Sequence, residues 1–214
     1  MEAQGLNPST PLNTAGLRAI AQVPKIKEQL RRYSEKLLAE FDWQFLERRY
    51  REDNAPTFPC VKDRYGKIAI EFITQDWVPS IDVGFLYDTT DHKVTFIRQD
   101  DGIDLTLRIS ADPVQNRRID PILSELHRGR DRIEKLEETQ RQRHFTRVLI
   151  KGEKSTRNPW TLLIAQKCLV HVIENCDSEA KQLEAIYGCL RQWLTALFSD
   201  PNLEMALKTL RPRR

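Results

Sequence analysis

Residues 128–157 form a basic segment whose side chains have the right types to bind phosphate. The segment carries ten Lys or Arg residues against five acidic ones. Arginine makes bidentate hydrogen bonds to phosphate and stacks on bases, so its excess over lysine here favours nucleic acid as the ligand. A surface that is only solvated, or that contacts protein, is the alternative. The predicted phosphate-binding residues are Arg128, Arg130, Arg132, Arg141, Arg143, Arg147, Lys151, Lys154 and Arg157.

Charge is divided unevenly between the two halves of the chain. The net charge is only +3, but residues 1–112 hold 15 basic and 18 acidic side chains, whereas residues 113–214 hold 19 and 13. A surface of one sign raises the local concentration of partners of the opposite sign. The second half is therefore predicted to meet an acidic partner, such as RNA or DNA.

The hexapeptide KGEKST at residues 151–156 partly matches the phosphate-binding loop GxxxxGK[ST]. That loop needs its first glycine so that backbone N–H groups can turn toward the phosphates. Gly152 is the only glycine of the basic segment apart from Gly129, and Glu153 separates it from Lys154. We interpret the hexapeptide as a basic turn, and no nucleotide cofactor is predicted.

Aspartates gather where the sequence predicts turns between strands. Paired carboxylates can hold Mg²⁺ for phosphodiester chemistry, which makes a metal-dependent phosphodiesterase the third of our alternatives. Aspartate is also a preferred turn residue because its side chain bonds to the nearby backbone, and we favour this interpretation. The predicted turn aspartates are Asp88, Asp91, Asp100, Asp101 and Asp104. Asp82, on a predicted strand after VPSI, is a further candidate for the metal-dependent alternative.

Histidines and cysteines do not form a recognisable metal-binding motif. The four histidines include no HxxxH pair and have no obvious acidic partner, and the four cysteines include no CxxC pair. Cys168 and His171 lie three residues apart on a predicted helix, but structural zinc normally takes two ligands from a tight turn. We predict cysteines that pack in the core and histidines at the surface, with no metal. The histidines are His92, His127, His144 and His171, and the cysteines are Cys60, Cys168, Cys176 and Cys189.

The first half of the chain predicts a helix followed by strands. Residues 24–46 place apolar side chains such as Leu30 and Leu37 at helical spacing, with Pro24 in the first turn and a separate short helix at 14–22. From residue 58 to residue 109 the apolar spacing changes to two, and short polar turns separate the runs. Short connections suit antiparallel neighbours, so this part predicts a meander of four to five strands.

After residue 112 the spacing is mostly helical again. A long polar helix is predicted at 119–143, and the run RVLIKG at 147–152 fits either a short strand or a continued helix. Further helices are predicted at 159–175, 178–197 and 201–210. The fold class is therefore α+β, with an N-terminal helix, an antiparallel meander of four to five strands and a C-terminal group of three to four helices.

The chain is expected to form one compact unit with loose ends. Residues 1–13 are a predicted flexible tail, 14–112 a helix with the antiparallel sheet, 113–210 a helical part packed on it, and 211–214 a basic tail. The sequence holds no apolar run near the roughly 18 residues of a membrane span, and its start lacks the apolar core of a signal peptide. We therefore expect a cytoplasmic protein without membrane contact.

Together these patterns favour binding over catalysis. The leading expectation is a non-catalytic nucleic-acid-associated protein, or a subunit of a nucleoprotein complex, that contacts phosphates through residues 128–157. The alternative is a protein-interaction or assembly subunit without nucleic-acid contact.

Overall fold

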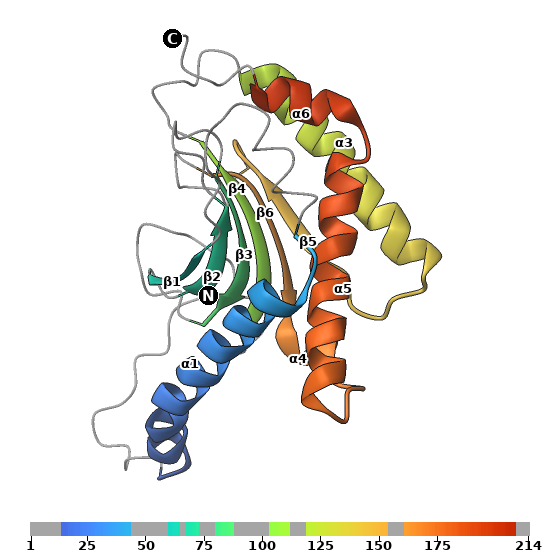
Figure 1. The fold of residues 1–214 in the computed structure, drawn as a ribbon. Helices are drawn as coiled ribbons and strands as arrows, with labels where there is room; N and C mark the ends of the chain where they lie inside the picture. Colours follow the sequence, from blue (N-terminus) through green and yellow to red (C-terminus); the bar gives the residue numbers. More distant parts are fainter. Residues whose placement is uncertain are drawn as a thin grey trace, which may run out of the picture.

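The computed structural model of the chain describes residues 14–43, 60–64, 67–72, 80–87, 103–111, 119–153 and 161–208. A six-stranded sheet lies at the centre of the described part, and helices pack along it (Figure 1). Neighbouring strands are all antiparallel and follow the order β1-β2-β3-β4-β6-β5. The strands are β1 (Cys60–Arg64), β2 (Lys67–Phe72), β3 (Ser80–Leu86), β4 (Asp104–Ser110), β5 (Arg147–Ile150) and β6 (Thr161–Cys168).

Two of these strands come from the second half of the chain. After β4 the chain forms a long helix, returns as the edge strand β5, and then inserts β6 between β4 and β5. Asp104 lies opposite Cys168 in this ladder, and the backbone N–H of Leu169 donates to the carbonyl of Ile103 at 2.8 Å. The end of β6 is thereby fixed to the start of β4, and the short helix that follows begins from a rigid position.

The helices pack against the sheet and against one another. Helix α1 contacts β1 and β2, α5 contacts β4, and α3 contacts β5, α5 and α6. Gly129 allows α3 and α5 to approach closely, because a Cβ atom there would lie 2.6 Å from Cδ2 of Leu197. The helices are α1 (Thr14–Glu40), α3 (Ile119–Thr139), α4 (Leu169–Ile173), α5 (Glu179–Phe198) and α6 (Pro201–Lys208).

The core lies between the helices and one face of the sheet. Ile70, Val83 and Leu107 are in register across three neighbouring strands and are each at most 1% exposed. Trp193 of α5 is the largest of the fully buried side chains. Burial of apolar area contributes about 25 cal/mol per Å², so this layer is the main source of stability.

The other face of the sheet carries buried charges. Asp82 on β3 lies between two cations: its Oδ1 is 2.7 Å from Nζ of Lys67, and its Oδ2 is 2.7 Å from a terminal nitrogen of Arg108. Burial raises the pKa of the Asp82 carboxyl, but the two cations outweigh burial and hold this pKa below its ordinary value. Lys67, Asp82 and Arg108 are called the sheet ion cluster below.

The fold confirms the predicted α+β class, with a sheet of six strands instead of four to five. The run RVLI is the strand β5, and α3 ends at Thr139, four residues before the predicted end. The tails at 1–13 and 211–214 lie outside the described residues. None of the described helices combines the length and the apolar character that crossing a membrane requires.

Two predicted elements are wrong. The helix predicted at 159–175 is wrong over residues 161–168, which form β6, and is confirmed only over α4 (Leu169–Ile173). Both faces of β6 are buried, so its sequence lacks the alternation that marks a half-buried strand. The two helices predicted on either side of residue 23 are one helix, α1, with Pro24 inside it. Proline removes a single backbone donor, and the remaining hydrogen bonds continue the helix across it.

Candidate functional site

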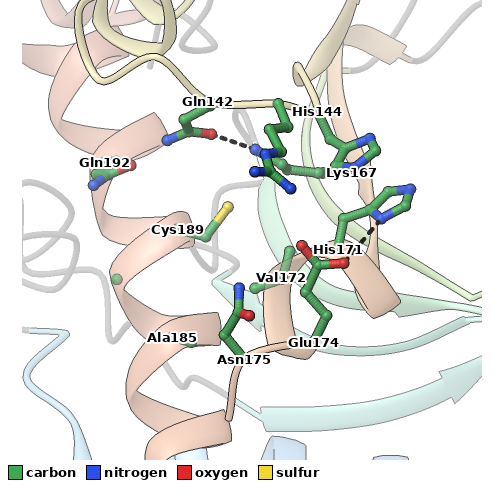
Figure 2. Close-up of a pocket in the computed structure, with 12 residues that line it drawn as sticks. Gln142, His144, Lys167, His171, Val172, Glu174, Asn175, Ala185, Cys189 and Gln192 are labelled. Atoms are coloured by element: carbon green, nitrogen blue, oxygen red, sulfur yellow. Dashed lines mark hydrogen bonds and ion pairs between the residues drawn. The ribbon is translucent and has the colours of Figure 1, made fainter.

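A pocket of about 450 Å³ lies where the loop after α3 meets α4 and one side of α5 (Figure 2). The loop, residues 140–146, is called the α3–β5 loop. It contributes three side chains to the wall, β6 contributes one, and the rest come from α4, the turn after it, and α5. The lining residues are Gln142, Arg143, His144, Lys167, His171, Val172, Glu174, Asn175, Ala185, Gly188, Cys189 and Gln192.

The α3–β5 loop starts with a tight backbone turn at the end of α3. The N–H of Gln142 donates to the carbonyl of Glu137 at 3.1 Å, and the N–H of Arg141 donates to that of Glu138 at 3.0 Å. This pair of bonds is the Schellman motif, which needs a left-handed residue after the helix. Arg141 takes that position with φ of 52°, where glycine is the usual choice. The turn directs the following residues toward the pocket.

Buried polar contacts hold the far end of the same loop. The Glu137 carboxylate is 3% exposed and accepts from the Thr146 N–H at 2.6 Å and from the Thr146 hydroxyl. Trp193 donates to that hydroxyl at 2.9 Å. Lys167 lies 3.2 Å from the Glu137 carboxylate and also donates to the Gln142 side chain. Because both ends of the loop are tied down, its backbone is held beside the pocket, where Gln142, Arg143 and His144 reach the wall.

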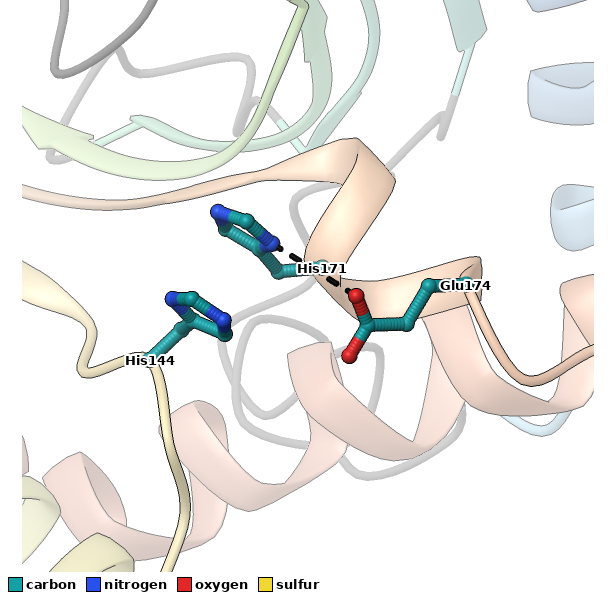
Figure 3. A group of neighbouring side chains, drawn as sticks. All are labelled: His144, His171 and Glu174. Carbon is teal, nitrogen blue, oxygen red and sulfur yellow. Dashed lines mark ion pairs between the residues drawn. The ribbon is translucent and has the colours of Figure 1, made fainter.

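Two histidines and a glutamate form a cluster in this pocket (Figure 3). The rings of His144 and His171 stack with parallel planes and centroids 3.5 Å apart. Nδ1 of His171 lies 3.8 Å from a carboxylate oxygen of Glu174. One ligand atom from each of the three residues lies within 4.8 Å of the others. Two imidazoles and a carboxylate are a donor set that suits Zn²⁺ and other divalent transition metals. We call these residues the histidine cluster.

Among the described residues that line the pocket, Cys189 is the one with a thiol, and its side chain points into the pocket from α5 (Figure 2). Burial raises the pKa of this thiol to about 12. A thiol with this pKa is neutral at physiological pH, and the thiolate is the nucleophilic form. Cys189 is therefore not poised for nucleophilic catalysis.

Three of the predicted phosphate-binding arginines make contacts within the fold. Arg128 pairs with Glu125 at 2.7 Å, and Arg130 pairs with Glu153 at 2.6 Å. Arg132 donates to the carbonyls of the last turn of α5, at 2.6 and 3.2 Å. A cation at this end of a helix also interacts favourably with the helix dipole. These guanidinium groups already have partners in the folded chain.

Other members of the predicted set lie in and after the α3–β5 loop. Arg141 and Arg143 are exposed, and Arg147 on β5 is partly buried opposite Gln166. Burial lowers the pKa of Lys151. Phe145, between the arginines, is 50% exposed, which is unusual for a large apolar side chain. Lys154 and Arg157 lie outside the described residues.

The described aspartates do not form a metal site. Asp82 and Asp104 are both 2% exposed and lie within β3 and β4. The prediction of Asp104 as a turn residue is therefore wrong, whereas Asp82 lies on a strand as expected. Asp82 pairs with the two cations of the sheet ion cluster, Lys67 and Arg108. Asp104 accepts a hydrogen bond from Gln166 at 3.3 Å. The remaining aspartates of the prediction, Asp88, Asp91, Asp100 and Asp101, lie outside the described residues.

The histidine cluster was missed by reasoning on the sequence. His171 was expected to share a helix with Cys168 and to lack an acidic partner, but Cys168 ends β6 and Glu174 is the partner of His171. The sequence does contain one signal for this pair: His171 and Glu174 are three residues apart, and residues at that spacing on a helix are neighbours. His144 lies 27 residues earlier in the chain, and only the folded structure brings its ring against His171.

Comparisons of the chain with protein-family models, with curated proteins and with solved structures give no match.

Proposed function

We propose that the chain is a non-catalytic nucleic-acid-associated binding protein, or a subunit of a nucleoprotein complex, that contacts nucleic acid with the α3–β5 loop and the start of β5. One observation carries the proposal: Phe145, which is 50% exposed, lies in a short stretch with Arg141, Arg143 and Arg147. Stacking of a base on an aromatic side chain contributes roughly 1–3 kcal/mol, and neighbouring arginines bind the phosphates. This combination favours single-stranded nucleic acid.

The contacts on either side of this surface support the proposal. The Schellman turn and the Glu137–Thr146 bonds hold the loop at both ends, so little ordering is required when a ligand binds. Arg130 and Arg132 then act indirectly, because their contacts with Glu153 and with the end of α5 hold α3 behind the loop. The Arg128–Glu125 pair lies within α3 itself. The four cysteines are free thiols, which supports the cytoplasmic location that we include in the proposal.

Fluorescence anisotropy with labelled single- and double-stranded DNA and RNA tests the proposal. We expect binding at about 50 mM salt that weakens steeply at about 200 mM, because each neutralised phosphate adds about 0.7–0.9 to the salt slope. The double variant Arg141→Ala/Arg143→Ala should reduce both the affinity and the slope. Phe145→Ala should weaken single-strand binding by about 10-fold and leave the slope unchanged.

A matched charge control is available outside the basic segment. Arg32 and Lys181 are exposed and lie on α1 and α5, so Arg32→Ala/Lys181→Ala removes the same charge without touching the loop. If this control and the loop variant lose equal affinity, binding depends on general electrostatics and not on the loop, which would contradict the proposed surface. Absence of binding at the lower salt would reject nucleic acid and leave the assembly subunit as the better hypothesis.

A further inference from the structure

We propose that His144, His171 and Glu174 bind one Zn²⁺ ion in the pocket, with the fourth coordination position open to the pocket interior. The proposal is independent of nucleic-acid binding, because it depends only on the donor atoms and is tested with the metal alone. Two imidazoles and one carboxylate, with a fourth position left to water or a ligand, are a donor set that proteins use for accessible zinc.

The distances between the donors are within reach of coordination. Zinc binds nitrogen and oxygen at about 2.0–2.1 Å, so two donors of a tetrahedral site lie roughly 3.3 Å apart. The three donor atoms here lie within 4.8 Å of one another, and the His171–Glu174 pair is already at 3.8 Å. The side chains of His171 and Glu174 are 26% and 42% exposed, and His144 is exposed. Rotation of side chains alone can therefore close the remaining gap.

Coordination requires the ring stack to open. An imidazole nitrogen binds metal in the plane of its own ring, and two parallel rings 3.5 Å apart cannot both direct such a lone pair at one ion. His144 is the residue that turns, because it is exposed and lies in the α3–β5 loop, whereas His171 belongs to α4. Metal binding should therefore replace the ring stack between the α3–β5 loop and α4 with a connection through the ion.

The charges around the site allow a divalent cation. Lys167 lies on the pocket wall, but the Glu137 carboxylate is 3.2 Å from its ammonium group and offsets its charge. Arg143 also lines the pocket and is exposed to water, which screens it. Two neutral imidazoles and one carboxylate leave a bound Zn²⁺ with a net charge of about +1, so the open position favours water or an anionic oxygen ligand.

Thiols are the rival ligands for zinc in this region. Cys189 lines the pocket, and Cys176 lies in the turn two residues after Glu174. Neither cysteine belongs to the group of described donors that lie within 4.8 Å of one another. Serine variants of both residues separate this alternative from the proposed one.

Isothermal titration of the full chain with zinc chloride, after treatment with EDTA, is the first test. We expect one Zn²⁺ per chain. Co²⁺ should give the intense visible absorption of a tetrahedral site. The thermal midpoint should rise by about 5–10 °C at a zinc concentration 100-fold above Kd. A chain that binds no Zn²⁺, or binds it without a thermal shift and with the weak spectrum of octahedral Co²⁺, overturns the proposal.

Variants then test which residues bind the metal. His144→Ala, His171→Ala and Glu174→Gln should each weaken zinc binding at least 10-fold, whereas the control His127→Ala and the double variant Cys176→Ser/Cys189→Ser should bind within 2-fold of the wild type. Because His144 is exposed, its variant should remain folded, as circular dichroism will show. Unchanged binding in His144→Ala, or loss of binding in the serine variant, assigns the metal to other ligands and contradicts the site.

Discussion

The sheet ion cluster and the histidine cluster both bring together side chains that are distant in the sequence, but they differ in what surrounds those side chains. In the sheet ion cluster, Asp82 is 2% exposed and lies 2.7 Å from a cation on each side. In the histidine cluster, two rings and one carboxylate line a pocket of about 450 Å³ and are all at least partly exposed. The first group meets its electrostatic requirements within the fold, and the second faces space that a ligand can enter.

This difference separates charges that stabilise the fold from groups that can bind a ligand. Removing one partner from a buried charge pair leaves the other without compensation, which costs about 3–5 kcal/mol. Partly exposed groups are hydrated, so changing one of them has a small effect on stability. Ligand sites are therefore expected among partly exposed groups, because a substitution there can alter binding and leave folding intact.

Asp82→Asn should have the largest effect on stability. The variant removes the carboxylate that pairs with the buried Lys67 and the partly buried Arg108, so the free energy of unfolding should fall by about 3–5 kcal/mol in urea denaturation. Glu35→Gln, which removes a carboxylate from an exposed ion pair on α1, is the control and should cause no measurable change. A loss below about 1 kcal/mol would show that water compensates the two cations, and the contrast between the clusters would disappear.

Acid should reproduce the effect of this substitution. The pKa of Asp82 is lower in the folded chain than in the unfolded chain, so its stabilisation is present in full above the unfolded value and is lost as the pH falls through the folded value. The difference in unfolding free energy between wild type and Asp82→Asn should therefore be constant near pH 7 and shrink below about pH 4. Urea denaturation of both proteins at pH 7 and pH 3 measures this difference. A difference that is larger at pH 3 than at pH 7 would contradict a lowered pKa for Asp82.

Glu137→Gln should have the next largest effect, because this carboxylate lies between the core and the pocket. The variant removes the charge that faces Lys167 and weakens two hydrogen bonds from Thr146, so we expect a loss of about 2–3 kcal/mol. Glu134→Gln, exposed on the same helix, is the matched control and should stay within about 0.5 kcal/mol of the wild type. A neutral result for Glu137→Gln would mean that the loop does not depend on this network.

Arg141→Gly should raise stability by about 0.5–1 kcal/mol. The residue has φ of 52°, a conformation that costs a non-glycine residue energy and costs glycine none, although glycine also loses more backbone entropy on folding. Arg141→Ala removes the same side chain but keeps the strain, so it should give no gain. Thermal unfolding of the three proteins measures both, and equal stabilities for the glycine and alanine variants would contradict the strained geometry.

His144→Ala should change stability least, by no more than about 0.5 kcal/mol, because the side chain is exposed. A small loss here beside a large loss in Asp82→Asn would distinguish a residue that can bind a ligand from one that stabilises the fold. Chemical denaturation in the presence of EDTA measures it without contributions from metal. A loss of more than about 2 kcal/mol would place His144 among the residues that hold the fold.

The predictable parts of the molecule are those in which neighbouring residues in the sequence determine the structure. Leu30 and Leu37 lie on the buried side of α1, and Leu105 and Leu107 lie in the core face of β4, as their spacing indicates. The strand β6 was not predictable in this way, because its eight residues are all buried and its short apolar run, Leu162 to Ala165, has the same pattern in a helix and in a strand.

The candidate site divides in the same manner. The sequence by itself determined the basic, arginine-rich composition of residues 128–157 and the three-residue spacing of His171 and Glu174, which we did not predict to be partners. Only the tertiary structure decided that Arg132 contacts the end of α5, that Phe145 is exposed, and that the His144 ring stacks on His171. The physical reason is that burial and contacts between distant residues depend on the packing of whole elements, whereas composition and helical spacing are properties of the chain before it folds.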